Sequence, residues 1–426
     1  MAYDYGAKEP EKLKIKDMTP KQKELLIDSK TFCMMPWLHL HAFPDGRAYP
    51  CCFALDQYPV GDLNKDSMET VFNSNDMKKM RLNMLDDRPS RQCTKCYDQE
   101  KSGFFSLRLS SNKHFGHNIG MVDNTNGDGS ADFVIKYWDI RFSNLCNLAC
   151  RSCGTWFSSN WYEDHKKLTG NPPNHAKIMR VGRTANDIWE QMLKQFDHVE
   201  QFYFAGGEPL IMEEHYRILK RLVEKKMFHV RLKYNTNFSQ VIYKGMDVFK
   251  EWDKFEYVEI GASLDATHKR GEYLRSGQSW EQVEENRKHV FEKCPRAFFF
   301  IATCVDVFNC FHVSDFHIDW IKKEWVGPHS LLNPLQTPEH LRVQILPKEM
   351  KDKLAEKWTN AQTWMKENTN ANHRRYESMI SYLYESDYTH MLNDWYDITN
   401  RLDKIRNENW REVFPELLDL EKIIKS

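Results

Sequence analysis

The chain lacks any apolar run long enough to cross a bilayer. Its most apolar stretch, Ala297 to Val307, contains a cysteine and is shorter than the roughly 20 residues of a membrane-spanning helix. The beginning of the sequence, MAYDYGAKEPEKLKIKD, also lacks the apolar core of a secretory signal. We therefore expect a soluble cytoplasmic protein that has no membrane partner.

The chain also lacks an excess of charge of either sign. Its formal net charge is -1, and basic and acidic residues are interspersed along most of the sequence. A nucleic-acid-binding protein is expected to carry a broad basic field, so this composition argues against nucleic acid as a partner. Internal repeats and long low-complexity tracts are missing as well.

Cysteine is present in an odd number, 11, and in tight groups. Grouped thiols are more typical of metal ligation in a reducing compartment than of a secreted disulfide framework. With 426 residues, of which 41% are hydrophobic, the chain is long enough to bury a large core and to form two or three domains.

Composition divides the first part of the chain into segments. Residues 1–30 are charged and polar, which predicts a loosely ordered arm. A cysteine-rich segment follows over residues 31–122, with one helix predicted over 68–85. Residues 123–130, DNTNGDGS, are rich in turn formers and predict a domain boundary.

Beyond this boundary, strands alternate with helices over residues 131–346. Strands are predicted over 133–142, 201–205, 229–234, 257–264, 297–305 and 341–346, and helices over 188–196, 216–226 and 280–293. This alternation predicts an α/β fold with a parallel sheet, and about six units predict a partial barrel. Residues 347–426 are predicted to form a helical C-terminal extension.

Cys146, Cys150 and Cys153 follow the first of these strands with the spacing Cys-x3-Cys-x2-Cys. Functional loops of parallel α/β folds leave the carboxyl ends of strands, so a cofactor site is expected here. Three thiolates can hold three irons of a 4Fe-4S cluster, and one iron then stays open for a ligand. Free buried thiols and a zinc site with a distant histidine are the alternatives.

A glycine-rich turn with the residues Gly206, Gly207 and Glu208 follows the next strand. Two glycines let the backbone approach a ligand closely, and the glutamate supplies an acceptor for a cationic amine. An ordinary turn between a strand and a helix is the alternative interpretation.

The cysteine triad and the glycine turn together resemble the radical S-adenosylmethionine (SAM) superfamily in order and distance. The resemblance extends to two strand ends and a following segment: Tyr234-Asn-Thr-Asn237, Gly261-Ala-Ser-Leu-Asp265 and Tyr273-Leu-Arg-Ser-Gly277. It implies a partial (β/α)6 radical SAM barrel. In this family a reduced cluster cleaves SAM to a 5'-deoxyadenosyl radical that abstracts hydrogen from a substrate.

The resemblance implies a 4Fe-4S cluster ligated by Cys146, Cys150 and Cys153, with SAM bound to the open iron. The implied SAM-binding residues are Gly206, Gly207, Glu208, Asn237, Ser263 and Arg275. For the last three the alternatives are equally open: Asn237 and Ser263 could hydrogen-bond only to the backbone, and Arg275 could be a surface cation. Many members carry an aromatic residue just before the third cysteine, where this chain has Ser152, so another side chain such as Trp156 is expected to pack on the adenine.

A second group of cysteines precedes the predicted barrel. Cys33, Gly46 and Cys51 follow the spacing Cys-x12-Gly-x4-Cys, and Cys93-x2-Cys96 comes later. The glycine predicts the turn of a β-hairpin. The spacing resembles the twitch and SPASM auxiliary modules, and it implies a second 4Fe-4S cluster on these four cysteines that accepts or relays electrons. A zinc site is the alternative, because four cysteines in two groups also suit tetrahedral zinc.

Cys52 is left over beside the implied ligand Cys51. A thiol here could relay a proton or a hydrogen atom, which makes Cys52 the candidate catalytic residue; a buried thiol and an alternative cluster ligand are the other interpretations. Auxiliary modules usually follow the barrel in this family, whereas this one precedes it and is expected to make an extensive contact near the barrel's carboxyl end. Phage-encoded radical SAM proteins with twitch-like domains look most similar, which makes a host cytoplasm a candidate location.

The leading hypothesis is a radical SAM enzyme that abstracts hydrogen from a peptide or a small metabolite. It implies SAM, two 4Fe-4S clusters and an electron donor such as flavodoxin or ferredoxin. A non-catalytic iron-sulfur electron carrier or sensor is the alternative, although it leaves the glycine turn without a role. A zinc-dependent RNA-binding module is a third possibility.

Overall fold

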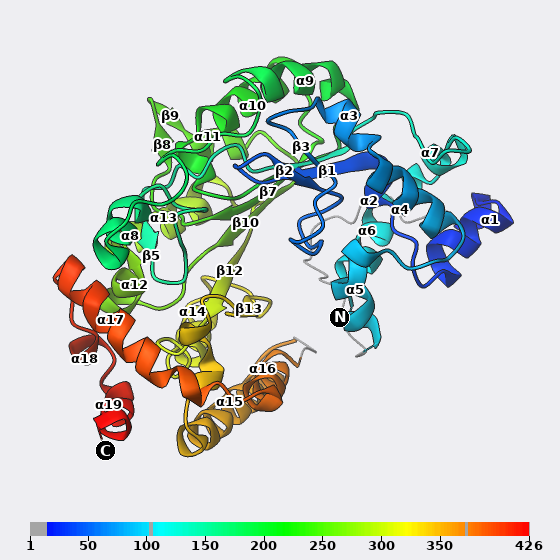
Figure 1. The fold of residues 1–426 in the computed structure, drawn as a ribbon. Helices are drawn as coiled ribbons and strands as arrows, with labels where there is room; N and C mark the ends of the chain where they lie inside the picture. Colours follow the sequence, from blue (N-terminus) through cyan, green and yellow to red (C-terminus); the bar gives the residue numbers. More distant parts are fainter. Residues whose placement is uncertain (1–14, 102–104, 371–373, 426) are drawn as a thin grey trace.

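Figure 1 shows the computed structural model, which describes residues 15–101, 105–370 and 374–425. Within them, a nine-stranded sheet runs in the order β13-β12-β10-β7-β6-β4-β1-β2-β3. Every neighbouring pair from β13 to β1 is parallel, and the last two pairs are antiparallel. The predicted α/β fold with a parallel sheet is therefore confirmed.

Strands and helices alternate along the barrel part of this sheet. The strands are β4 (Tyr137–Ile140), β6 (Gln201–Phe204), β7 (Arg231–Thr236), β10 (Val258–Ala262), β12 (Phe298–Val305) and β13 (Leu331–Pro334). The helices between them are α8 (Trp161–Thr169), α9 (Asp187–Gln195), α10 (Glu213–Glu224), α11 (Val248–Trp252), α12 (His268–Leu274), α13 (Trp280–Lys293) and α14 (Val313–Lys322). Short strand pairs are β5 (Ala149–Cys150) with β11 (Arg275–Ser276) and β8 (Ile242–Tyr243) with β9 (Met246–Asp247).

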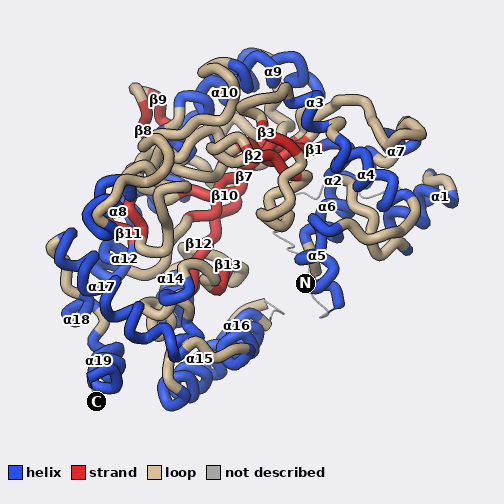
Figure 2. The backbone as a smooth tube through the Cα atoms, viewed as in Figure 1, coloured by secondary structure: helices blue, strands red, loops and turns tan. Residues whose placement is uncertain are grey.

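The two faces of the sheet differ in polarity. In β7, the side chains of Leu232, Tyr234 and Thr236 are buried, whereas Arg231, Lys233 and Asn235 remain partly exposed. Alternate residues of a strand point to opposite faces, so one face packs on helices and the other carries polar groups. Figure 2 shows helices α9, α10 and α11 along one side of the strands.

The cysteine-rich segment joins the barrel through the sheet itself. Strand β1 (His39–Ala42) pairs in parallel with β4, with His39 opposite Tyr137 and His41 opposite Asp139. The predicted hairpin is confirmed: β1 and β2 (Arg47–Tyr49) are antiparallel, and Gly46 has the positive φ of 92° that a tight turn requires. Strand β3 (Gly61–Asp62) completes the edge.

The remaining elements of this segment are α1 (Pro20–Lys23), α2 (Met35–Leu38), α3 (Met68–Phe72), α4 (Asn75–Leu85), α5 (Thr94–Lys101), α6 (Leu107–Phe115) and α7 (Gly120–Asp123). The single helix predicted over residues 68–85 is wrong, because Asn73 and Ser74 separate α3 from α4. The Asn73 side chain bonds the backbone of Ala131, and Ser74 caps α4 by accepting from the Met77 amide.

The predicted loose arm is also wrong where the structure describes it beyond α1. A π-helical turn, η2 (Glu24–Asp28), follows α1 and buries Leu25 and Leu26 in the main core. Residues 1–14 lie outside the described residues. The same core continues through the barrel to Val326, so the cysteine-rich segment and the barrel bury apolar side chains together.

The strand predicted over residues 341–346 is wrong. Two 3-10 turns, η7 (Glu339–Leu341) and η8 (Val343–Ile345), stand there, and the strand that pairs with β12 is β13. The alternating Leu341, Val343 and Ile345 are buried, but they pack in a second core with the C-terminal helices instead of a sheet. Strand β13 ends in a proline, which is tolerated at the edge of a sheet.

The predicted helical C-terminal extension is confirmed over the described residues. It contains α15 (Lys348–Asn368), α16 (Arg375–Glu385), α17 (Leu392–Arg406), α18 (Trp410–Val413) and α19 (Leu418–Lys425). Helix α17 packs on α8, as Figure 1 shows at the lower left of the molecule. Within the described residues, no helix combines the length and apolar character that crossing a membrane requires.

Arg81 is a buried hydrogen-bonding centre of the cysteine-rich segment. Its guanidinium donates to the carbonyl oxygens of Pro36, Phe72 and Gly129 at 2.9, 2.7 and 3.1 Å. We predict that Arg81→Met lowers the free energy of unfolding by about 3 kcal/mol, because these buried carbonyls lose their donor. Urea unfolding measures this. The exposed Arg88→Met serves as the control, and equal midpoints for the two variants would contradict the prediction.

Candidate functional site

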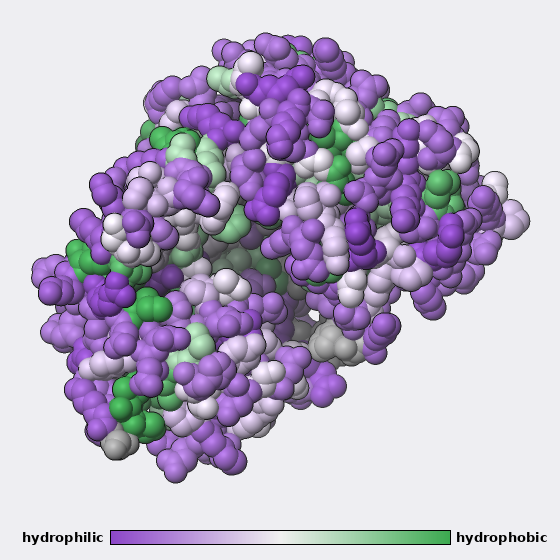
Figure 3. All heavy atoms as spheres, viewed as in Figure 1, coloured by the Kyte–Doolittle hydropathy of each residue, from purple (hydrophilic) through white to green (hydrophobic). Residues whose placement is uncertain are grey.

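Partly exposed polar side chains line the inner face of the parallel strands. They come from successive strands and the loops that follow them: Arg141, Tyr203, Lys233, Asn235, Ser263 and Cys304. Figure 3 shows a hollow in the middle of the face that Figure 1 turns toward the reader. An open, polar inner wall of this kind suits a ligand site better than a filled barrel core does.

The cysteine loop leaves the carboxyl end of β4. Cys146 and Cys150 are buried around Leu148, and Cys153 packs against them. The loop is held in place because β5, which contains Cys150, pairs with β11 at Arg275. The three predicted ligands are therefore brought together at the edge of the sheet where a cofactor site was expected.

The thiols of this loop disfavour one another's ionisation. Burial raises the pKa of Cys146 above the ordinary thiol value, and the neighbouring Cys150 adds to the rise. Burial likewise raises the pKa of Cys153 to about 12, again with Cys150 contributing. Bound iron would reverse this by supplying positive charge to three adjacent thiolates.

Hydrogen-bond donors point at two of the sulfurs. The Leu148 amide and the Asn237 side-chain amide donate to Cys146 Sγ at 3.5 and 3.9 Å. Arg275 Nη1 donates to Cys150 Sγ at 3.6 Å. Such donors stabilise thiolate sulfur, so the residues of this loop fit a cluster ligated by cysteine.

The glycine turn lies against the cysteine loop. The Glu208 amide donates to the Leu145 carbonyl at 2.8 Å, and a Cβ on Gly207 would stand 2.4 Å from that same oxygen. Gly206 and Gly207 both have positive φ angles, of 77° and 49°. Glycine is therefore needed here for close contact with the cysteine loop, whatever ligand the turn also approaches.

The Glu208 carboxylate is buried and already accepts three hydrogen bonds. Its Oε1 accepts from the Leu210 amide at 2.9 Å and from Thr236 Oγ1 at 2.7 Å, and its Oε2 accepts from the Asn237 amide at 2.6 Å. Burial raises the pKa of Glu208 to about 7 despite these bonds. A carboxylate has about four acceptor positions, so about one remains for an amine.

The other three predicted SAM-binding residues occupy different places. Asn237 contacts the cysteine loop, donating to Asn147 Oδ1 at 2.9 Å. Arg275 pairs through Nε with Asp265 at 2.8 Å as well as contacting Cys150. Ser263 is half-buried on the inner wall.

Trp156, expected to pack on the adenine, is 42% exposed. Its ring contacts His175 at 4.6 Å between centroids, and the guanidinium of Arg47 lies 5.8 Å from its centre. Arg47 belongs to the β1–β2 hairpin, so this tryptophan joins the cysteine loop to the N-terminal segment.

The four N-terminal cysteines also come together. Burial raises the pKa of Cys33 and Cys51, and each is raised further by its interactions with Cys93 and Cys96. Burial raises the pKa of Cys93 to about 12. The guanidinium of Arg108 opposes this rise for three of the four thiols. Sequence reasoning missed Arg108, because nothing in its position along the chain marks it.

Among the described residues, no three or more His, Cys, Asp or Glu side chains lie close enough together to hold a single metal ion. A cubane cluster binds each cysteine at a separate iron, so its ligands stand further apart than the roughly 3.8 Å between sulfurs of a tetrahedral zinc site. The spacing that a single metal ion requires is therefore not the right test for cluster binding at either group of cysteines.

Cys52 is exposed by surface area, yet its thiol lies beside the buried carboxylate of Asp139 and the cation of Arg141. Burial raises the pKa of this thiol to about 12, and Asp139 adds to the rise. Asp139 is itself held by Arg141 Nε at 2.8 Å and His41 Nδ1 at 3.1 Å.

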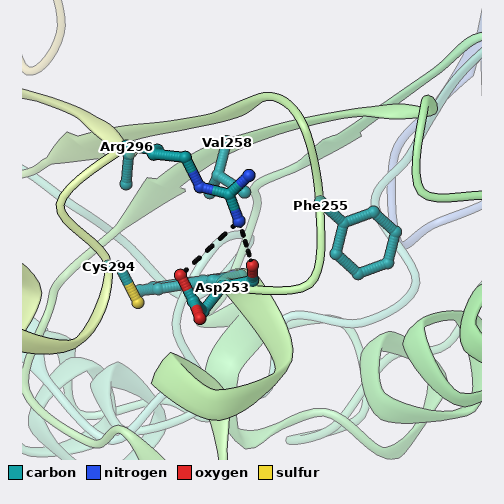
Figure 4. Close-up of a pocket in the computed structure, with 7 residues that line it drawn as sticks. Asp253, Phe255, Val258, Cys294 and Arg296 are labelled. Carbon is teal, nitrogen blue, oxygen red and sulfur yellow. Dashed lines mark hydrogen bonds and ion pairs between the residues drawn. The ribbon is translucent and has the colours of Figure 1, made fainter.

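A small pocket lies away from this site. Figure 4 shows it lined by Asp253, Phe255, Val258, Cys294 and Arg296. Val258 begins β10, and Arg296 precedes β12, so the pocket is at the amino ends of the strands. The cysteine loop lies at the opposite, carboxyl end.

Two sequence families match the chain. The Radical SAM superfamily matches residues 140–309, and the SPASM iron-sulfur cluster-binding domain matches residues 33–97. The chain therefore contains a radical SAM domain. It also contains a SPASM domain, which precedes the radical SAM domain. The first domain implies a 4Fe-4S cluster and SAM, and the second implies auxiliary iron-sulfur binding. Among curated proteins, none matches the chain.

Solved structures offer more distant similarities. Native anSMEcpe with bound AdoMet is 19% identical over 58% of this chain and 66% of its own, with a TM-score of 0.39. Native anSMEcpe with AdoMet and the Cp18Cys peptide is 15% identical over 58% and 65%, with a TM-score of 0.35. Streptococcus suis SuiB bound to S-adenosylmethionine is 14% identical over 68% and 62%, with a TM-score of 0.34. The chain spans less than two thirds of the length of each.

The contact between the glycine turn and the cysteine loop can be tested by adding one methyl group. We predict that Gly207→Ala lowers the iron content by about four atoms per chain, because its Cβ displaces the Leu145 carbonyl. Gly154→Ala, in the cysteine loop itself, is the matched control, because a Cβ there meets nothing within 4 Å. Iron analysis after anaerobic reconstitution measures both, and full iron in the Gly207 variant would contradict the prediction.

Proposed function

We propose that this protein is a radical SAM enzyme that abstracts hydrogen from a peptide or small-metabolite substrate bound in the hollow. One observation carries the proposal: β5 of the cysteine loop lies at the left and α5 of the N-terminal segment at the right of Figure 1, on either side of the hollow that Figure 3 shows in the same view. A substrate bound between them would be within reach of two redox centres. The proposed extents are 31–122 for the auxiliary module, 131–346 for the barrel and 347–426 for the extension.

Cys146, Cys150 and Cys153 would ligate the first 4Fe-4S cluster. When bound and reduced, this cluster supplies the electron that cleaves SAM into methionine and a hydrogen-abstracting 5'-deoxyadenosyl radical. Gly206, Gly207 and Glu208 would orient the amino group of SAM through the remaining acceptor on the buried carboxylate. Asn237, Ser263 and Arg275 would contact the rest of SAM or the loop that holds the cluster.

The inner wall would position the substrate. Lys233 Nζ and Glu259 Oε2 form an ion pair of 2.9 Å on this wall, and Tyr257 donates to the same carboxylate oxygen at 2.6 Å. Paired charges keep the wall polar without a large net charge. This character suits the amide groups of a peptide or the hydroxyl groups of a small metabolite.

Cys33, Cys51, Cys93 and Cys96 would ligate the auxiliary 4Fe-4S cluster, which would accept or relay an electron. A donor such as flavodoxin or ferredoxin would reduce the SAM-binding cluster. An electron carrier or sensor is the competing function. SAM cleavage separates the two, because a protein with a reducible triad cluster that leaves SAM intact would not be an enzyme of this family. Incubation with deuterated candidate substrates then identifies the substrate as the compound that transfers label to 5'-deoxyadenosine.

The triad prediction concerns a variant with Cys146, Cys150 and Cys153 replaced by alanine. We expect it to lose about four irons and all SAM cleavage, because the first cluster loses its ligands. Iron analysis and chromatography of 5'-deoxyadenosine measure this. Cys294→Ala, which removes a buried thiol bonded to the Phe249 carbonyl, should keep both. Unchanged iron in the triple variant would overturn the assignment.

The auxiliary prediction concerns the double variant Cys93→Ala and Cys96→Ala. We expect it to keep SAM cleavage and to lose product formation, because electron transfer beyond the first cluster is interrupted. The measurement compares 5'-deoxyadenosine with product in the same reaction. Full product formation would show that the N-terminal centre is structural, and zinc in place of iron would favour a zinc site on these four cysteines.

Cys52 is the proposed donor of a proton or hydrogen atom to the substrate, from its place beside Asp139 and Arg141. We expect Cys52→Ser to keep SAM cleavage and both clusters but to lower product formation by at least tenfold, since a hydroxyl gives up its hydrogen atom far less readily than a thiol. Iron analysis confirms the clusters. Unchanged product formation would remove Cys52 from the mechanism.

A further inference from the structure

The C-terminal helix α17 is anchored directly to the cysteine loop. Arg151, between Cys150 and Cys153, has a side chain only 2% exposed, and its Nη2 donates to Asp403 Oδ1 and Glu408 Oε2, each at 2.5 Å. Tyr273 supports the same carboxylate, donating to Asp403 Oδ1 at 2.8 Å. The two carboxylates thus more than neutralise Arg151, and the extension becomes a wall of the cysteine loop.

A second arginine of α17 approaches the loop without being neutralised in the same way. Arg406 has a side chain 5% exposed, and its Nε pairs with Asp164 of α8 at 2.9 Å. Its Nη1 and Nη2 are buried and have no hydrogen-bond partner within the described residues. Buried cationic N–H groups without an acceptor are costly, so these two nitrogens indicate a negative partner that the polypeptide does not itself supply.

The cysteine loop is where that negative partner belongs. The Arg406 guanidinium lies over the ring of Trp161, 4.8 Å from its centre, and Trp161 Nε1 donates to the Cys150 carbonyl at 2.6 Å. The Arg406 guanidinium is therefore separated from the backbone of the proposed ligand Cys150 by a single aromatic ring.

We propose that Arg406 is a positioning residue for the radical SAM cluster. It brings a buried positive charge from the C-terminal extension to the cluster and so favours the reduced form. The inference rests on the proposed function of the triad. A cluster ligated by three thiolates is negatively charged and becomes more so when it gains an electron, so a nearby buried cation stabilises the reduced form. The extension then sets how readily the cluster is reduced, in addition to packing on the barrel.

The test is a redox titration of the reconstituted full-length protein, followed by electron paramagnetic resonance. The signal that changes on addition of SAM identifies the triad cluster and separates it from the auxiliary cluster. We expect Arg406→Gln to lower the ratio of reduced to oxidised triad cluster at a fixed potential by roughly tenfold, equivalent to about 59 mV for a one-electron couple. Arg406→Lys, which keeps the charge, should stay near the wild type.

A second variant distinguishes electrostatics from structure. Asp164→Asn removes the partner of Arg406 but leaves its charge, so the reduced fraction should rise. If the ion pair between Arg406 and Asp164 were only structural, both variants would shift the reduced fraction of the cluster in the same direction, or neither would shift it. Lys404→Gln removes an exposed charge from the same helix and is the matched control, with no change expected.

An unchanged midpoint in Arg406→Gln with intact iron would overturn the proposal, as would parallel shifts in Arg406→Gln and Asp164→Asn. If Arg406→Gln fails to fold, Asp164→Asn decides alone: a higher reduced fraction supports the proposal, and a lower or equal one overturns it. A wild-type protein without a reducible, SAM-responsive cluster overturns the proposed function itself. If the wild-type cluster is reducible and responds to SAM but the variants do not shift as expected, only the role of Arg406 is overturned.

Discussion

The parallel pairing of β1 with β4 is the interaction on which the arrangement of this protein depends. It sets His39 opposite Tyr137 and His41 opposite Asp139, so the cysteine-rich segment extends the sheet of the barrel instead of hanging from a linker. Backbone hydrogen bonds between strands are directional, and a shift by one residue would turn the polar face of β1 toward the apolar core. The hairpin and the loop with Cys51 and Cys52 are therefore held at a fixed place beside the barrel.

Charge is buried around this sheet in compensated sets. Asp139 sits between Arg141 and His41, and these two hold its pKa well below the usual carboxyl value although burial acts the other way. Lys233 and Glu259 pair farther along the same wall. Such pairs keep polar groups on the wall of a hollow at tolerable cost, because each buried charge has a partner. Arg406 also has a partner, Asp164, at its Nε, but its Nη1 and Nη2 lack a hydrogen-bond acceptor within the described residues.

The carboxyl end of the barrel gathers parts from the whole chain. The cysteine loop, the glycine turn and the end of β7 meet through the Glu208 amide and carboxylate, and the C-terminal helix reaches the same loop through Arg151 and Asp403. Residues 252 positions apart thus share one hydrogen bond of 2.5 Å. Short, buried contacts join these segments to the loop that carries the sulfurs, so the site is better described as a junction of four segments than as one motif.

The sequence was a good guide where the signal is local. The spacing of Cys146, Cys150 and Cys153, the glycines before Glu208 and the alternation of strands with helices each depend on residues close together in the chain, and they predicted the parallel sheet and the radical SAM family. It failed at residues 341–346, because two buried 3-10 turns and a strand show the same alternation of apolar residues, and only packing against the C-terminal helices separates them.

The amino-acid sequence by itself determined the donor groups of this protein and their order along the chain. Tertiary structure alone decided that the Glu208 carboxylate accepts hydrogen bonds from Leu210, Thr236 and Asn237. It also placed Cys52 beside Asp139 and Arg406 near Cys150. The physical reason is that these interactions act over different distances along the chain. Spacing and turn chemistry act over a few residues, whereas burial, ion pairing and the electric field at a sulfur depend on which distant segments the folded chain brings into contact.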